Sequence, residues 1–204
     1  MTIKKSRYLF ANTLGIVACG GKSSRMGEDK SLLIYNLKPQ RYAVYDMILP
    51  FCEEVFISCN QDQVNNMAAG YGVIADMERY KECGPISGLL SAMHHFPGKN
   101  ILFFGCDYPL VEASDVRSFA EQCTDHIRPA AFYDRKDGFY EPLLAYYPHD
   151  AFPVLEQMHT AGDYSLQHYL QHHDAQQFIP VDKKIMNVNN RQDYLMIREQ
   201  FSGN

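Results

Sequence analysis

Residues 15–33 read Gly-Ile-Val-Ala-Cys-Gly-Gly-Lys-Ser-Ser-Arg-Met-Gly-Glu-Asp-Lys-Ser-Leu-Leu. The apolar, β-branched run at residues 14–18 predicts a buried strand, which stops at Gly20 and Gly21, where the backbone can turn sharply and approach a ligand closely. Within ten residues of Gly20 the chain has three cationic side chains and two hydroxyls: Lys22, Arg25, Lys30, Ser23 and Ser24. N–H groups, hydroxyls and cations on one loop suit the oxygens of a polyphosphate.

This glycine loop matches neither of the two best-known phosphate-binding loops. A P-loop needs glycine, four residues and then Gly-Lys-Ser/Thr; residues 21–23 supply the end, but Gly15 lies one residue too early. The dinucleotide pattern G-x-G-x-x-G fails because Gly20 and Gly21 are adjacent and the next glycine is Gly27. The cations nevertheless cluster on this loop in a chain that is acidic overall, which favours anion binding over an ordinary surface turn.

The composition is that of a globular protein. The chain has 204 residues, 46% hydrophobic and 21% charged, enough to bury one substantial core, so we expect a single domain over residues 1–204 with a short N-terminal extension at residues 1–12. No apolar run approaches the roughly 20 residues of a membrane span, and the N-terminus lacks the apolar core of a secretory signal. We therefore expect neither membrane attachment nor secretion.

Charge and cysteine content narrow the partners and the compartment. The formal net charge of −5 argues against a nucleic-acid partner, which would require a broad basic face. The six cysteines include no C-x-x-C pair and lie in or beside apolar runs, which favours reduced core thiols over a zinc site. Reduced thiols are typical of the cytoplasm, where we expect this protein.

Strand and helix signals alternate through the first half of the chain. Strands are expected at residues 54–58, 72–75 and 101–105, and helices at residues 40–49, 60–70 and 84–93. On the first helix, Tyr42, Tyr45 and Leu49 are expected to share the apolar face. The alternation predicts an α/β fold with a mostly parallel sheet and helices on both faces, a Rossmann-like three-layer α/β/α sandwich.

Residues suited to bind a ligand follow the predicted strands. Gly20 and Gly21, Asn60, Asp76 and Asp107 each come at the end of an apolar run. In open parallel sheets ligands bind at the carboxyl ends of the strands. We therefore expect these four stretches of chain to meet at one edge of the sheet.

From Pro129 onward the pattern changes. Residues 130–133 and 139–147, separated by the turn residues Arg-Lys-Asp-Gly at 135–138, predict an antiparallel excursion in the C-terminal half. The remaining elements are expected as two helices, a strand and a last helix at residues 150–158, 165–171, 177–181 and 191–200.

Asp107 is the carboxylate best placed for chemistry. It follows the apolar residues 103–105 almost directly, and an acid at that place is costly unless it binds a metal or a hydrogen-bond donor. Mg²⁺ prefers oxygen ligands and commonly takes one or two from the protein together with substrate phosphates. Asp107 is therefore a candidate Mg²⁺ ligand, and a turn cap before Pro109 is the alternative.

Residues 20–33, Gly-Gly-Lys-Ser-Ser-Arg-Met-Gly-x-Asp-Lys-x-Leu-Leu, resemble the signature of nucleotidyltransferases with a MobA-like fold, and most closely that of the molybdenum cofactor guanylyltransferases. The resemblance spans essentially residues 13–194 and implies a nucleotide-diphospho-sugar transferase-like fold. At the start of the loop, the guanylyl branch usually has Ala-Gly-Gly and the cytidylyl branch Ala-Ala-Gly. Residues 18–21 here read Ala-Cys-Gly-Gly, nearer the first pattern but with Cys19 at a usual alanine.

The resemblance implies nucleotide contacts outside the loop. Asp76 and the segment with Gly84, Pro85 and Gly88 match the segment that contacts the nucleotide, and an ordinary turn before a helix is the alternative. Asn60 matches an Asn-bearing strand end less tightly.

Two further segments resemble family motifs near the metal and the second substrate. Residues 186–190 resemble a block that supplies a side-chain oxygen to the metal, so that either Asn187 or Asn189 would join Asp107 as a ligand. Helix capping by these asparagines is the alternative. Residues 141–146 resemble a Gln-Pro-Leu segment near the second substrate, with Glu141 in place of Gln.

By resemblance, the expected reaction is nucleotidyl transfer with Mg²⁺ as cofactor. GTP would be the donor, the molybdopterin form of molybdenum cofactor the acceptor, and pyrophosphate and the guanine dinucleotide cofactor the products; cofactor-delivery proteins would be further partners. Arg25, Lys30 and Asp107 would be catalytic. The nucleotide-binding residues would be Ala18, Cys19, Gly20, Gly21, Lys22, Ser23, Lys30, Asn60, Asp76, Gly84, Pro85, Gly88 and Asp107.

Two other functions are compatible with the same residues. A related nucleotidyltransferase would use CTP, or would transfer to another phosphorylated acceptor such as a sugar phosphate. A nucleotide-binding regulator without turnover is the alternative of another class, because Glu141 and the block around Asn187 depart from the family pattern.

Overall fold

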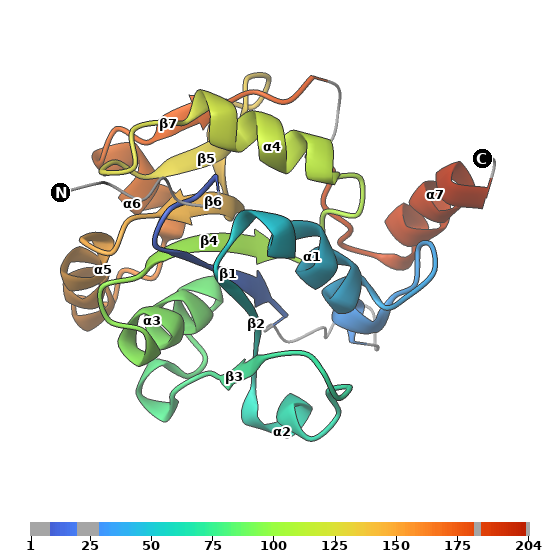
Figure 1. Cartoon of the computed structure of the whole chain (residues 1–204), viewed down its shortest axis with the longest axis horizontal. Helices are drawn as coiled ribbons and strands as arrows, with labels where there is room; N and C mark the ends of the chain where they lie inside the picture. Colours follow the sequence, from blue (N-terminus) through green and yellow to red (C-terminus); the bar gives the residue numbers. More distant parts are fainter. Residues whose placement is uncertain (1–8, 20–28, 182–184, 203–204) are drawn as a thin grey trace, which may run out of the picture.

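The computed structural model describes residues 9–19, 29–181 and 185–202, so the expected N-terminal extension lies outside the described residues up to residue 8 (Figure 1). Within the described residues a seven-stranded sheet has the order β3-β2-β1-β4-β6-β5-β7. The strands are β1 (Thr13–Ala18), β2 (Glu54–Cys59), β3 (Val73–Ala75), β4 (Asn100–Gly105), β5 (Ala130–Asp134), β6 (Phe139–Tyr147) and β7 (Gln176–Phe178).

The sheet has a parallel and an antiparallel part, as the sequence predicts. β1 pairs in parallel with both β2 and β4, and β2 pairs in parallel with β3. β6 runs antiparallel to β4 and β5, while β7 is parallel to β5. The antiparallel excursion of the C-terminal half is therefore confirmed, and β6 joins it to the parallel part.

Helices cover both faces of the sheet (Figure 1). They are α1 (Gln40–Ile48), α2 (Gln61–Val64), α3 (Pro85–His95), α4 (Ala113–Gln122), α5 (Ala151–Thr160), α6 (Leu166–His172) and α7 (Arg191–Ser202), with short 3₁₀ turns η1 (Lys30–Leu32), η2 (Leu49–Phe51) and η3 (Glu78–Tyr80). No helix in the described part of the chain combines the length and hydropathy that a bilayer crossing requires.

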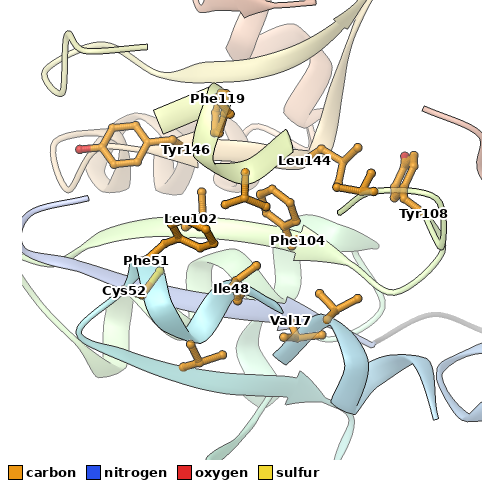
Figure 2. Packing of buried hydrophobic residues seen from close by; sticks show 14 of the residues in the cluster. Val17, Ile48, Phe51, Cys52, Leu102, Phe104, Tyr108, Phe119, Leu144 and Tyr146 are labelled. Carbon is orange, nitrogen blue, oxygen red and sulfur yellow. The ribbon is translucent and has the colours of Figure 1, made fainter. Parts of the chain in front are cut away.

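Two hydrophobic clusters, one on each face, explain the continuous apolar runs of the central strands. Along β4, Leu102 and Phe104 belong to the cluster under α1 and α4, whereas Ile101 and Phe103 belong to the cluster under α3, α5 and α6. Figure 2 shows the first cluster, with Leu102 and Phe104 among residues from α1 and α4 such as Phe119. The three-layer α/β/α architecture is therefore confirmed.

The structure corrects several details of the predicted elements. α4 is not predicted at all; its apolar stripe comprises only Val116, Phe119 and Ala120, although the spacing is that of one helix face. The helix expected over residues 60–70 is a single turn, and β7 starts and ends earlier than expected. Leu49 is 42% exposed, because α1 ends at Ile48 and Leu49 starts the η2 turn instead of sharing the buried face.

Candidate active site

The carboxyl ends of β1 and β4 lie side by side. Ala18 of β1 pairs with Gly105 of β4, and in the next register position the sulfurs of Cys19 and Cys106 are 3.3 Å apart. The Cys106 thiol also donates to the carbonyl of Ala18 at 3.0 Å. The chain therefore enters the glycine loop directly beside the strand end that precedes Asp107.

Most of the glycine loop lies outside the described residues. Gly20, Gly21, Lys22, Ser23 and Arg25 are among them, so their predicted roles stay predictions. The residues on either side of the loop are described, and they give the position of its two ends.

The far end of the loop also reaches the same edge. Lys30, in η1, donates from Nζ to the Val188 carbonyl at 2.9 Å and to Asn189 Oδ1 at 3.4 Å. Asp29 caps η1 by accepting from the Ser31 amide at 3.0 Å. Cys19 and Lys30, the described residues nearest the glycine loop on its two sides that make these contacts, therefore both adjoin the Asp107 region.

Asp107 is bound to the segment around Asn187. The Asn187 amide nitrogen donates to Asp107 Oδ2 at 2.9 Å, and the Val188 N–H donates to the Asp107 carbonyl at 2.9 Å. Burial is the main cause that raises the pKa of Asp107, and the Asn187 hydrogen bond and the charge of Lys30 oppose it. A cation beside Asp107 would therefore relieve the cost of burying its charge.

Two buried oxygens in this pair have no hydrogen-bond partner among the described residues: Asp107 Oδ1 and Asn187 Oδ1. A buried, unsatisfied polar atom is destabilising, and most such atoms in proteins are satisfied by water, an ion or a ligand. Asn189, by contrast, is exposed and its Oδ1 accepts from Lys30. The geometry thus separates the two asparagines that the sequence leaves open, because Asn187 contacts Asp107 and Asn189 contacts Lys30.

Gly105 allows the Asp107 carboxylate to fold back over the end of β4. A Cβ at residue 105 would lie 2.6 Å from Asp107 Oδ1, closer than such atoms approach each other, and 3.1 Å from Leu143 Cβ, a tight contact. A side chain at Gly105 would therefore displace the carboxylate.

Asp76 forms a second polar site at the carboxyl ends of β2 and β3. Its Oδ1 accepts from the buried Ser58 hydroxyl at 2.8 Å, and burial, opposed by this bond, raises the pKa of Asp76. A Cβ at Gly88 would lie 2.5 Å from Ser58 Oγ, so α3 approaches this pair closely only because residue 88 is glycine. Gly84 precedes α3 at φ +79°, and Pro85 begins the helix.

Asn60 caps the short helix α2. Its Oδ1 accepts from the Gln63 amide at 3.0 Å, and Gln63 Oε1 accepts from the Asn60 amide at 3.1 Å, which makes a capping box for α2. Gln63 Nε2 in turn donates to Asp29 Oδ2 at 2.7 Å. The end of β2 is thereby connected to the far end of the glycine loop.

Sequence reasoning does not identify Tyr108 or Ser58 as site residues. The Tyr108 hydroxyl donates to Glu141 Oε2 at 2.6 Å, and both side chains are buried. Burial is the main cause that raises the pKa of Glu141 to about 7. The position of Tyr108 directly after Asp107 is the only signal in the sequence, and it does not reveal the partner on β6.

Comparison with known proteins gives a family match over most of the chain. The family described as MobA-like NTP transferase domain matches residues 15–177. A molybdenum cofactor biosynthesis bifunctional protein from Synechocystis is 30% identical over 181 residues, which cover 88% of this chain but 52% of that protein, so the chain spans about half its length. A molybdenum cofactor guanylyltransferase from Pseudomonas putida is 27% identical over 177 residues, covering 85% of this chain and 91% of the relative.

Solved structures share the fold. The molybdopterin-guanine dinucleotide biosynthesis protein A from Archaeoglobus fulgidus has a TM-score of 0.74 at 22% identity and covers 94% of this chain and all of its own. A CMP:2-keto-3-deoxy-manno-octonic acid synthetase, solved with CTP, has a TM-score of 0.72 at 16% identity, covering 94% of this chain and 98% of its own. With the family match over residues 15–177, these findings show that the chain belongs to the MobA-like NTP transferase family.

Proposed function

We propose that this protein transfers GMP from GTP to the terminal phosphate of molybdopterin-bound molybdenum cofactor and releases pyrophosphate. The main support is that Cys19 and Lys30, which flank the glycine loop, both lie beside the segments that carry Asp107 and Asn187 at the carboxyl edge of the sheet. Relatives that span most of this chain are named molybdenum cofactor guanylyltransferases, which favours GTP and this acceptor.

Such a reaction depends on alignment and charge neutralisation more than on a protein nucleophile. The acceptor phosphate attacks the α-phosphorus of GTP, and the bond to the leaving pyrophosphate breaks in line. Lys30 would contact the phosphates from the end of the loop, together with Lys22, Arg25 and Ser23 and the N–H groups of Gly20 and Gly21. Ala18 and Cys19 would supply backbone at the start of the loop.

Mg²⁺ fits the pair of unsatisfied oxygens. Asp107 Oδ1 and Asn187 Oδ1 are hard oxygen donors on two side chains that are hydrogen-bonded to each other. When bound there, the ion would neutralise charge on the donor phosphates. The described residues contain no group of three or more His, Cys, Asp or Glu that could hold a metal, and Mg²⁺ needs no such group when substrate phosphates complete its shell.

Asp76 would contact the base or ribose of the nucleotide. Ser58 occupies one oxygen of its carboxylate and thereby orients the other toward a ligand N–H or O–H. Gly84, Pro85 and Gly88 would allow the start of α3 to lie close to the nucleotide, and Asn60 would act through the cap of α2.

Pyrophosphate release tests this proposal. We would incubate purified protein with Mg²⁺, loaded acceptor and each of the common nucleoside triphosphates, and we expect release only with GTP. Lys30→Ala should abolish release, whereas Lys38→Ala, which removes a lysine from a surface ion pair with Asp46, should not.

Three results would contradict the proposal. A preference for CTP, which the structural neighbour solved with CTP keeps open, would replace the guanylyl assignment. Turnover with a sugar phosphate instead of molybdenum cofactor would replace the acceptor. Tight GTP binding without release under any condition would indicate a regulator.

A further inference from the structure

Glu141 is a buried acid at the site to which the proposed reaction gives no task. It lies on β6, is 8% exposed, and accepts a hydrogen bond from the Tyr108 hydroxyl at 2.6 Å. The Tyr108 ring packs in the same hydrophobic cluster as Leu144 of β6, and both are seen in Figure 2. Tyr108 is therefore held from two sides, by packing along its ring and by one hydrogen bond at its end.

Tyr108 in turn connects to the pair assigned to the metal. It follows Asp107 directly in the chain, so a fixed Tyr108 side chain also restrains the backbone that carries the Asp107 carboxylate. Asn187 donates to Asp107 Oδ2. Glu141 is thus hydrogen-bonded to Tyr108, Tyr108 adjoins Asp107 in the chain, and Asp107 is hydrogen-bonded to Asn187, a series that runs from β6 to the end of β4.

Asn187 needs such support because its segment is irregular. Residues 185–190 form neither helix nor strand, so side-chain contacts determine which way the amide points. Val188 holds the backbone of the segment by its bond to the Asp107 carbonyl and by packing with Leu33. The direction of the Asn187 amide is then determined by its hydrogen bond to Asp107 Oδ2.

We propose that Glu141 is a positioning residue for nucleotidyl transfer. By accepting a hydrogen bond from the Tyr108 hydroxyl, it fixes the residue next to Asp107, and so holds the Asp107 carboxylate and the Asn187 amide bonded to it in the arrangement that binds the divalent cation. Glu141 itself does not touch the reacting atoms. The expected effect of Glu141 on turnover rests on the proposed function. Its expected effect on cation binding does not, because cation binding can be measured without turnover.

Three variants test the series of contacts. Glu141→Gln keeps an oxygen that can accept from Tyr108, Glu141→Met keeps the size but removes the acceptor, and Tyr108→Phe removes the donor. Tyr140→Phe is the matched control, since Tyr140 is a buried tyrosine on the same strand whose hydroxyl donates to the Ala175 carbonyl instead. The measurement is Mn²⁺ binding to the protein with GTP by electron spin resonance, followed by the Mg²⁺ dependence of pyrophosphate release.

We expect Glu141→Met and Tyr108→Phe each to weaken Mn²⁺ binding about tenfold, the range found when a residue behind a metal ligand is removed. The double variant should be no weaker than either single variant, because both changes break the same contact. Glu141→Gln and Tyr140→Phe should bind Mn²⁺ as the unchanged protein does.

The proposal is overturned if Glu141→Met and Tyr108→Phe lower the melting temperature but leave Mn²⁺ affinity unchanged, which would make the contact merely structural. It is also overturned if Glu141→Gln weakens binding as much as Glu141→Met, or if the two single effects add. If the unchanged protein binds Mn²⁺ and GTP without releasing pyrophosphate, the proposed function fails, and the Mn²⁺ titrations still decide the role of Glu141.

Discussion

Two carboxylates at the carboxyl edge of the sheet differ in how their oxygens are satisfied. Asp76, after β3, receives the Ser58 hydroxyl on Oδ1, the same oxygen that faces Gly88 of α3. Asp107, after β4, receives the Asn187 amide on Oδ2, and its Oδ1 is buried with no partner among the described residues. The first carboxylate is already anchored by a neutral donor, whereas the second retains a buried oxygen that a cation would satisfy.

Two acids at similar positions on the sheet can therefore have different roles. Burial is the main cause that raises the pKa of both acids, so each is destabilised as an anion. Among the described residues, the charge of a lysine, Lys30, opposes this effect at Asp107, whereas the Ser58 hydrogen bond opposes it at Asp76. This contrast favours the proposal that Asp107 binds the cation and the phosphates and that Asp76 contacts the neutral part of the nucleotide.

The largest expected effect follows from removing the acid that lacks a partner. Asp107→Ala should lower the rate of transfer by about 1,000-fold or more, in the range found when a group that stabilises transition-state charge is lost. The melting temperature should be unchanged or higher, because the variant no longer buries a charge. Steady-state pyrophosphate release and thermal unfolding together check this, and a variant that unfolds early while retaining its rate would contradict the assignment.

The two glycines beside the carboxylates give the next largest effect and separate the two sites. In Gly105→Ala the new methyl group would push Asp107 Oδ1 aside, and a displacement near 1 Å should lower the rate about 100-fold. Gly88→Ala would instead strike Ser58 Oγ and should raise the KM for GTP with little change in Mg²⁺ dependence. If both alanine variants altered Mg²⁺ dependence equally, the two carboxylates would not have distinct tasks.

A smaller effect is expected for Asp76 itself. Asp76→Asn keeps the shape of the side chain and an oxygen that can accept from Ser58, but it weakens the acceptor that we assign to the nucleotide. We expect the KM for GTP to rise about tenfold, the loss of one hydrogen bond to a charged group. Kinetics at saturating Mg²⁺ measure it, and an unchanged KM would remove Asp76 from the nucleotide site.

The sequence predicts the positions of Asp76 and Asp107 because each follows a strand that the apolar pattern predicts. The run at β4, before Asp107, is apolar on both faces, as a buried parallel strand requires, and the shorter run at β3, before Asp76, is also apolar, so the ends of both strands are found with little error. α4 is missed because a three-residue stripe is a weak periodic signal. The carboxyl edge of the sheet can therefore be predicted from the sequence, whereas a helix that covers the sheet with a short apolar stripe is harder to predict.

The contacts that distinguish the carboxylates are not predictable in the same way. Ser58 is 18 residues from Asp76, and Tyr108 is 33 residues from Glu141, so no local pattern joins either pair. The choice between Asn187 and Asn189 depends on the path of an irregular segment, which the packing of Val188 determines. Such details arise from the tertiary structure alone.

The smallest expected effect concerns stability and pH. Burial is the main cause that raises the pKa of Glu141 from 4.5 to about 7, so the folded protein favours the protonated acid. The stabilisation that comes from protonated Glu141 is fully present below about pH 4.5 and is lost as the pH rises through about 7. Relative to Glu141→Gln, the unchanged protein should lose free energy of unfolding over that interval, on the order of 1 kcal/mol for each tenfold difference in proton affinity between the folded and unfolded states.

Denaturant titrations at pH 4.5, 6 and 8 would measure the stability difference between Glu141→Gln and the unchanged protein. A difference that does not grow with pH would mean that Glu141 is charged at neutral pH in the folded protein. In that case Tyr108 would donate to a charged carboxylate instead of a neutral acid. The comparison of Asp107 with Asp76 would not be affected.

A crystal structure of the protein with GTP and Mn²⁺, using the anomalous signal of the metal, would show whether Asp107 and Asn187 bind the cation. We predict one Mn²⁺ bound by Asp107 Oδ1 and Asn187 Oδ1 and by GTP phosphate oxygens, with the phosphates against the loop that starts at Cys19 and the nucleoside near Asp76. A metal bound away from Asp107, or a triphosphate bound at another edge of the sheet, would contradict the account.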